Sequence, residues 1–217
     1  MKVIAINGSP RKNWNTDTLL KRAIEGAASV GAETELINLY ELNYRGCISC
    51  FACKRKDGKM AGHCAMKDDL TDVLEKAITS NVLLLGSPIY LGDITGAMRS
   101  FLERFVFMNL SYEESHRTNF TGKISIGFIY TMGIPQEMVE ESGYKYNFNL
   151  HMQYLQLLNG TTEYLISSDA YQFDDYSKYA VSKFNEKHKA KVREEQFPMD
   201  CQKAFEMGVR LVTPYLQ

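Results

Sequence analysis

Five short apolar runs with the character of buried strands recur along the chain, separated by stretches with helical spacing of apolar residues. The runs are KVIAIN (2–7), ETELINL (33–39), NVLLLGSP (81–88), KISIGFIYT (123–131) and TEYLIS (162–167). The helical stretches cover residues 16–30, 68–80, 95–108 and roughly 147–158. Because parallel strands need crossover connections that pack on the sheet, this alternation predicts a parallel sheet with helices on both faces. Runs such as VLLLG are apolar throughout, as doubly covered strands require.

Right-handed crossovers between five such strands fit the flavodoxin-like order 2-1-3-4-5. The length of 217 residues is ordinary for one α/β domain, and we expect a single domain over 1–217. The charged segment from about residue 171 onward is helix-like and is expected to close the last face of the sheet. In this topology ligands bind beyond the carboxyl ends of the strands, so the loops after the strands are the place to look for function.

The charge balance and the N-terminus limit the classes of partner. Twenty-five basic and twenty-six acidic residues give a net charge of −1. The chain therefore lacks the excess of basic residues with which proteins bind nucleic acid or an anionic membrane. The apolar run VIAI near the N-terminus is too short for a signal peptide or a membrane span. We expect a cytoplasmic protein with a small-molecule partner, and neither a nucleic-acid nor a membrane partner.

The loop after the first strand, NGSPRKNWNTDTLL (7–20), can wrap an anion. It combines a glycine, small hydroxyl side chains and two cations with the start of a helix, and this set suits a phosphomonoester. It matches neither the P-loop nor the dinucleotide-binding pattern. The alternative is an ordinary capped helix after a turn. The candidate phosphate-binding residues are Ser9, Arg11, Lys12, Asn15, Thr16 and Thr18.

The loops after the third and fourth strands offer a place for a planar ring. The stretch GSPIYLGDITGAMRSFLERF (86–105) begins with a short loop that presents backbone amides and an aromatic side chain, and its glycine permits close backbone approach. The turn YTMGIP (130–135) falls where a third contact to the same ligand is expected. A rim aromatic and plain turns are the alternative. The candidates are Pro88, Ile89, Tyr90, Leu91, Gly92, Asp93, Thr131 and Gly133.

The stretch GCISCFACKRKDGKMAGHC (46–64) holds four of the five cysteines, namely Cys47, Cys50, Cys53 and Cys64. Four thiolates are the normal ligand set of a [4Fe–4S] cluster. Zinc bound by four thiolates and a Cys50–Cys53 redox pair are further alternatives, and the remaining one is a loop of free thiols. The residues leave these alternatives open, and we favour free thiols over a cluster. Cys201 is expected to be an ordinary thiol.

Taken in this order, the three stretches resemble the flavodoxin-like NAD(P)H-dependent FMN reductases, the group that contains the iron–sulfur flavoproteins. The resemblance rests on GSPRKNWNT (8–16), on the cysteine stretch followed by KDDL, and on residues 86–105. It implies that Ser9, Arg11, Asn15 and Thr16 hold the FMN phosphate, and that the loop Pro88 to Asp93 contacts the isoalloxazine ring.

The sequence departs from this family pattern at two places. Trp14, the only tryptophan, stands where small polar residues are usual, and it either covers the phosphate or is exposed. The interval between Cys53 and Cys64 is longer than the compact spacing of the iron–sulfur flavoproteins. It contains four cations, Lys54, Arg55, Lys56 and Lys59. This second departure weakens the match to a cluster site.

The resemblance implies an enzyme that passes reducing equivalents from NAD(P)H through FMN to a small electron acceptor such as a quinone or free flavin. It also implies a homodimer or higher homo-oligomer. No catalytic acid or base is assigned, because FMN carries the redox chemistry and the four histidines are scattered. The alternative is an FMN electron-transfer flavoprotein, with or without an iron–sulfur cluster, that turns over little nicotinamide. The sequence names neither the acceptor nor a choice between NADH and NADPH.

Overall fold

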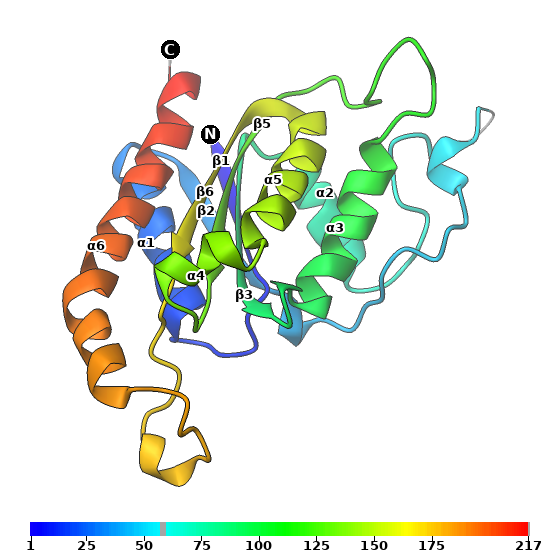
Figure 1. The fold of residues 1–217 in the computed structure, drawn as a ribbon. Helices are drawn as coiled ribbons and strands as arrows, with labels where there is room; N and C mark the ends of the chain where they lie inside the picture. The colour runs from blue at the N-terminus through cyan, green and yellow to red at the C-terminus, as the bar shows by residue number, and fades with distance from the viewer. Residues whose placement is uncertain (57–59, 217) are drawn as a thin grey trace.

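The computed structural model describes residues 1–56 and 60–216 and has a parallel sheet at its centre (Figure 1). The sheet order is β2-β1-β3-β5-β6, and all four pairings in it are parallel. This confirms the predicted flavodoxin-like order. The strands are β1 (Lys2–Asn7), β2 (Glu33–Asn38), β3 (Val82–Tyr90), β5 (Ile124–Thr131) and β6 (Asn159–Ser167).

One further strand, β4 (Asp93–Ile94), pairs antiparallel with the end of β3. The sequence analysis did not predict it, because a two-residue strand has no periodicity of its own. It converts the loop after β3 into a small hairpin.

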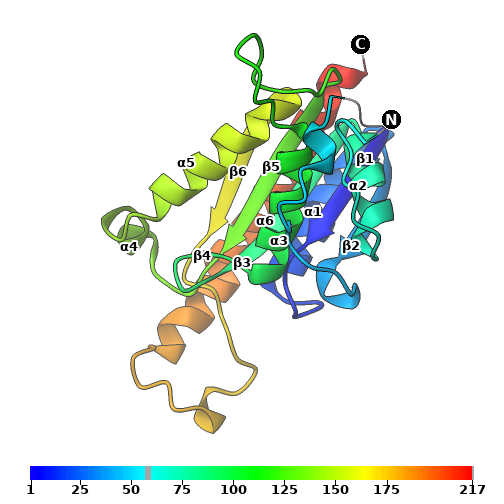
Figure 2. The ribbon, with the colours of Figure 1, turned by 90° about the vertical axis from the view of Figure 1, so that its right-hand side faces the viewer.

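Helices cover both faces of the sheet, as predicted (Figure 2). One face carries α1 (Asn15–Ser29) and α6 (Glu186–Val212), and the other carries α2 (Leu70–Ile78), α3 (Gly96–Asn109) and α5 (Tyr144–Leu155). The short helix α4 (Gln136–Glu141) precedes α5. Among the described residues, 3₁₀ turns lie at Leu39–Glu41, Ala52–Lys54, Gln156–Leu158, Tyr176–Lys178 and Thr213–Tyr215. Each face has its own apolar core, because the central strands are buried on both sides.

The C-terminal helix α6 packs closely on α1 and closes one face of the sheet. A Cβ added at Gly208 of α6 would lie 1.9 Å from the backbone oxygen of Ala23 in α1, so only glycine fits this crossing. The preceding segment, residues 171–185, contains only a 3₁₀ turn and no α-helix, so the helical tail starts later than the sequence pattern suggested. None of the described helices combines the length and apolar character needed for a bilayer crossing.

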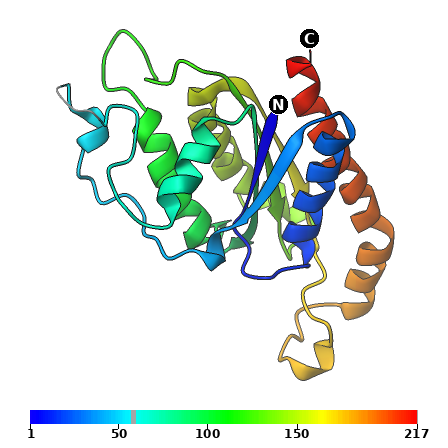
Figure 3. The same cartoon turned by 180° about the vertical axis from the view of Figure 1, so that it is seen from behind.

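The carboxyl ends of the parallel strands lie at one end of the molecule, and the two chain termini lie at the other (Figures 1 and 3). The segment between β6 and α6 projects from the end that carries the carboxyl ends of the strands (Figures 1 and 2). The loop that holds the cysteines runs instead along the outer side of α3 (Figure 3). The fold therefore separates the loops after β1, β3, β5 and β6 from the cysteine stretch, which belongs to the connection between β2 and α2.

Candidate functional site

The end of β3 and the loops that follow β1, β5 and β6 enclose one pocket of about 80 Å³ at the carboxyl ends of the strands. The predicted ring loop starts later than expected, because Pro88, Ile89 and Tyr90 still belong to β3. Nine of the residues predicted to bind cofactor line it together: Ser9, Arg11, Asn15, Thr16, Pro88, Ile89, Tyr90, Thr131 and Gly133. The pocket thus joins the predicted phosphate loop to the predicted ring loop, as the topology requires. Trp14, Met132, Ala170 and Gln172 also line it. Of these, the sequence analysis considered only Trp14, as a residue that either covers the phosphate or is exposed.

Five predicted residues lie outside the lining of this pocket. Lys12 forms an exposed ion pair with Glu41, and its hydrogen bond lowers the pKa of that carboxyl group. Thr18 lies one helical turn into α1, where its backbone N–H donates to the oxygen of Trp14. The remaining three, Leu91, Gly92 and Asp93, form the tip and return strand of the β3–β4 hairpin.

The start of α1 is arranged to receive an anion. Buried Asp17 holds the preceding loop in place by accepting hydrogen bonds from Asn7 Nδ2 at 3.1 Å and from the Asn13 backbone N–H at 2.7 Å. Trp14 occupies the N-cap position and makes no side-chain cap hydrogen bond. The first N–H groups of the helix therefore lack a capping side chain, and together with the helix dipole they favour a negatively charged ligand.

Two polar side chains beside this helix start have their positions set by distant parts of the chain. Thr16 Oγ1 lies 2.7 Å from Thr131 Oγ1, which links the phosphate loop to the end of β5. Asn15 Nδ2 donates to the Tyr171 oxygen at 2.9 Å, and Asn15 Oδ1 accepts from Arg193 of α6 at 2.6 Å. The segment after β6 and helix α6 therefore take part in shaping the phosphate end of the pocket.

The β3–β4 hairpin forms a rigid edge of the site. Leu91 and Gly92 at its tip have φ values of 51° and 92°, as a two-residue type I′ turn requires, and Leu91 is fully exposed. A non-glycine residue in this left-handed conformation carries strain, which the surroundings must hold. Asn147 of α5 donates to the Gly92 oxygen at 3.1 Å, and Arg99 of α3 donates to Asp93 at 2.8 Å.

Buried His151 also fastens this hairpin. Its Nε2 lies 3.3 Å from Asp93 Oδ1, and its Nδ1 lies 3.2 Å from the Tyr130 hydroxyl. Burial lowers the pKa of His151 in spite of the opposing charge of Asp93, and burial raises the pKa of Tyr130. Burial thus favours the neutral imidazole, and the contacts of the ring tie the hairpin to β5. The sequence analysis had assigned it no role.

The chemistry of this pocket fits FMN. A helix start without a capping side chain and the cation Arg11 suit a phosphate, and Tyr90 supplies an apolar wall on the side of the hairpin. Two residues that line the pocket, Trp14 and Gln172, each carry a buried polar atom, Nε1 and Oε1, without a hydrogen-bond partner in the protein. Unpaired buried atoms of this kind are rare in folded proteins and point to a polar ligand.

The four clustered cysteines line a second, small cavity beside α3. Cys47, Cys50, Cys53 and Cys64 all border this space of about 20 Å³, and all five cysteines of the chain are free thiols. Burial raises the pKa of Cys53, against the nearby charge of Lys54. The ammonium group of Lys54 caps the C-terminal end of α3 by donating to the carbonyls of Phe107 and Leu110.

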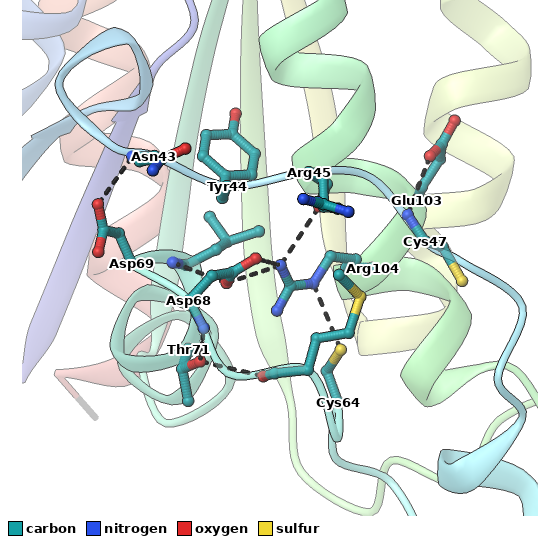
Figure 4. Close-up of polar contacts among 12 residues, drawn as sticks. Asn43, Tyr44, Arg45, Cys47, Cys64, Asp68, Asp69, Thr71, Glu103 and Arg104 are labelled. Carbon is teal, nitrogen blue, oxygen red and sulfur yellow. Dashed lines mark hydrogen bonds and ion pairs between the residues drawn. The ribbon is translucent and has the colours of Figure 1, made fainter.

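Buried Arg104 of α3 joins this cavity to the KDDL segment (Figure 4). Its Nη1 donates to both carboxylate oxygens of Asp68, at 2.8 and 2.6 Å, and its Nε donates to Cys64 Sγ at 3.3 Å. Burial by itself lowers the pKa of Arg104, but the hydrogen bonds to Asp68 and Cys64 outweigh burial, so the pKa is raised. On the other side of the loop, Glu103 accepts from the Cys47 backbone N–H at 3.2 Å (Figure 4).

The four thiols of the cavity match a [4Fe–4S] cluster in number, but in this structure they are not gathered around one metal position. Within residues 1–56 and 60–216, no three His, Cys, Asp or Glu side chains are arranged to hold one ion. Four thiols around one cavity are the normal ligand set of a [4Fe–4S] cluster, and Arg104, which also lines the cavity, carries a buried donor, Nη2, without a partner. The cavity has room for about one water molecule, so binding a cluster requires the loop to open. Lys59, one of the cations noted in the sequence, lies outside the described residues.

Comparison with known proteins points to one family for this chain. The family described as NADPH-dependent FMN reductase matches residues 1–157. An iron–sulfur flavoprotein of Methanocaldococcus jannaschii is 32% identical over 127 residues, which are 58% of this chain and 62% of that protein. An iron–sulfur flavoprotein of Archaeoglobus fulgidus is 38% identical over 104 residues, which are 48% of each chain. The chain therefore spans about half to three fifths of the length of these relatives.

A solved structure shows the same fold over nearly the whole chain. An NAD(P)H:quinone oxidoreductase from Methanothermobacter marburgensis superposes with a TM-score of 0.72, covering 97% of this chain and 98% of its own at 16% identity. At this level of identity the likeness supports the fold alone. The sequence match to the family, in contrast, covers both ligand loops and the cysteine stretch. On that match, the protein belongs to the NADPH-dependent FMN reductase family.

Proposed function

We propose that the protein is an FMN-dependent oxidoreductase that passes reducing equivalents from NAD(P)H to a small acceptor such as a quinone or free flavin. The observation that supports this proposal best is the pocket at the carboxyl ends of the strands. It combines a helix start suited to a phosphate with a hairpin suited to a planar ring, in a chain of the FMN reductase family. Bound FMN would supply the hydride and electron chemistry.

The chain's own residues would bind and orient the cofactor. Ser9, Arg11 and Thr16, with the N-terminal turn of α1, would hold the phosphate. The rigid β3–β4 hairpin would present Tyr90 and its backbone N–H groups to the ring edge, while Thr131 and Gly133 border the same space. His151 would act on the ring only through Asp93 and the hairpin. The protein thus contributes orientation, and we assign it no acid or base.

The test is reconstitution with FMN followed by anaerobic titration with NADH and NADPH. We expect a yellow protein whose visible flavin absorbance is bleached by at least one of the nicotinamides, because hydride transfer to flavin removes that absorbance. Rapid steady-state turnover with a quinone would support the enzyme. Slow reduction by both nicotinamides would favour the electron-transfer flavoprotein, and failure to bind FMN would contradict both functions.

A specific observation favours a second cofactor at the cysteine cavity. Four thiols border one space, the buried side chain of Arg104 lines it and donates to Cys64 Sγ, and both relatives described above are named iron–sulfur flavoproteins. We propose that Cys47, Cys50, Cys53 and Cys64 hold a [4Fe–4S] cluster in the protein as it is made in the absence of oxygen. The sequence alone favoured free thiols, and the names of these relatives are the reason that we propose a cluster instead.

We also propose that the chain acts as one domain, as a homodimer in the cytoplasm. Tyr146 and Tyr154 of α5 are exposed, and Tyr154 borders a mainly apolar groove of about 450 Å³ between α3 and α5, which supports an interface there. Light scattering at micromolar concentration is expected to give twice the chain mass of 24.8 kDa. A single-chain mass would contradict the interface and leave FMN binding unaffected.

A further inference from the structure

Two of the buried polar atoms that lack a partner belong to residues that line the same small pocket. Across residues 1–56 and 60–216, three buried side-chain atoms have no hydrogen-bond partner in the protein. One, Arg104 Nη2, belongs to a residue that lines the cysteine cavity. The other two are Trp14 Nε1, a donor, and Gln172 Oε1, an acceptor, and both residues line the pocket at the end of the strands. A donor and an acceptor left unpaired in one place indicate a ligand that offers both kinds of partner.

A single flexible side chain connects these two residues. The guanidinium of Arg11 stacks over the Trp14 ring at 4.1 Å from its centroid, and Arg11 Nη1 donates to the backbone oxygen of Gln172. Arg11 is itself exposed, so it can turn toward an arriving phosphate at little cost. Such a turn would exchange the bridge to Gln172 for a charged hydrogen bond to the ligand.

The position of Gln172 is set by the segment after β6, which packs on the loop after β5. The backbone N–H groups of Asp169 and Ala170 donate to the oxygens of Ile134 and Met132 at 2.7 and 2.9 Å. Buried Lys189 of α6 donates to both Asp169 Oδ1 and the Gly133 oxygen, at 2.6 and 2.8 Å. These hydrogen bonds hold the segment in place as one wall of the pocket, although it lies beyond residues 1–157, which match the family.

The side chain of Gln172 extends from this segment toward Gly133 and lines the pocket. Its backbone N–H donates to the Tyr176 hydroxyl at 3.0 Å, which fixes the main chain. Its side-chain amide lies against Gly133, where an added Cβ would come within 2.7 Å of Nε2. A side chain at position 133 would therefore displace the amide. The glycine predicted to contact the flavin thus makes room for the amide of Gln172.

We propose that Trp14 and Gln172 recognise the ribityl phosphate arm of FMN, an inference that rests on the proposed function. The indole N–H of Trp14 donates to a phosphate oxygen, because a phosphate dianion offers only acceptors and Arg11 and the helix start lie beside this residue. The side-chain oxygen of Gln172 accepts from a ribityl hydroxyl, which is the donor that this arm carries. These two residues thereby distinguish FMN from flavins that lack the phosphate or the whole arm.

The test measures dissociation constants of three ligands, FMN, riboflavin and lumiflavin, for two variants. Trp14→Phe keeps an aromatic ring under Arg11 and removes the donor, so the dissociation constant of FMN should rise about 10- to 100-fold while that of riboflavin changes less than about twofold. Gln172→Met keeps the length of the side chain and removes the acceptor. It should weaken FMN and riboflavin alike, by about 3- to 10-fold, and leave lumiflavin unchanged.

Flavin fluorescence reports binding in all variants, and the emission of the single tryptophan gives a second readout in the wild type and Gln172→Met. Gln202→Met on the exposed side of α6 is the matched control and should change no constant. Retained riboflavin and lumiflavin binding shows that the variants are folded. Wild-type protein that binds no flavin would overturn the proposed function itself. Wild-type binding of FMN with unchanged constants in both variants, or with equal losses for all three ligands, would overturn this inference alone.

Discussion

Protein purified without oxygen is expected to carry about four iron and four acid-labile sulfide per chain. Each of the variants Cys47→Ser, Cys50→Ser, Cys53→Ser and Cys64→Ser should lose this iron, because the four thiols border one cavity and no other cysteine lies near it. Iron and sulfide analysis of the anaerobic protein, with electron paramagnetic resonance after reduction, measures the effect.

Cys201→Ser is the matched control for this series. Cys201 lies in α6 and packs against the core on the opposite face of the sheet, so its replacement should leave the iron content unchanged. FMN binding should survive in all five variants, because the cysteines are absent from the lining of the flavin pocket. Iron-free anaerobic protein that still binds FMN would show that the cysteine stretch is a loop of free thiols and would refute the cluster.

Replacing Arg104 with methionine is expected to lower the free energy of unfolding by about 3–5 kcal/mol, as is typical when one partner of a buried ion pair is removed. The Arg104 side chain is fully buried and Asp68 is only 16% exposed, so the carboxylate would remain in a poorly solvated place without its counter-ion. The substitution also removes the donors to Cys64 Sγ and to the Arg45 oxygen. Urea denaturation of the iron-free, FMN-free protein, read by circular dichroism, measures the loss.

Two further variants separate the buried charge from a general effect of the substitution. Lys76→Met breaks an ion pair with Glu35 in which both side chains are about two fifths exposed, and it should cost less than about 1 kcal/mol. Adding Asp68→Asn to Arg104→Met removes the uncompensated charge while keeping an oxygen for the Leu70 N–H, so it should recover part of the loss. Equal losses for Arg104→Met and Lys76→Met would contradict this role of Arg104.

The strand order and the place of the ligand loops were predictable because they follow from local patterns. The run VLLLG is apolar at every position, which is how a strand covered on both faces must read, and β3 is buried along this stretch. The loops after such strands then meet at one edge, which brought Ser9, Pro88 and Thr131 into one pocket. The residues in these loops were identifiable because their positions depend mainly on the strand that precedes them.

The side chains of Lys12 and Asp93 have other partners than the sequence analysis predicted. Both belong to loops that the sequence analysis identified, but Lys12 pairs with Glu41 and Asp93 with Arg99 and His151 instead of lining the pocket. Which way a side chain points from a loop depends on the partners that surround it, and these partners come from distant segments. A loop can therefore be assigned from sequence while the orientation of its individual side chains is not.

The sequence by itself determined the parallel sheet, its order and the three loops that carry the family resemblance, since periodicity and turn residues act over a few neighbouring positions. Only the tertiary structure decided that Gln172 lines the pocket at the carboxyl ends of the strands and that Arg104 contacts Cys64. Gln172 is placed through contacts of Lys189 with Asp169 and with Gly133, and Arg104 lies 40 residues from Cys64 in sequence. Such contacts form only when separate elements pack against the same sheet, so no local pattern in the chain encodes them.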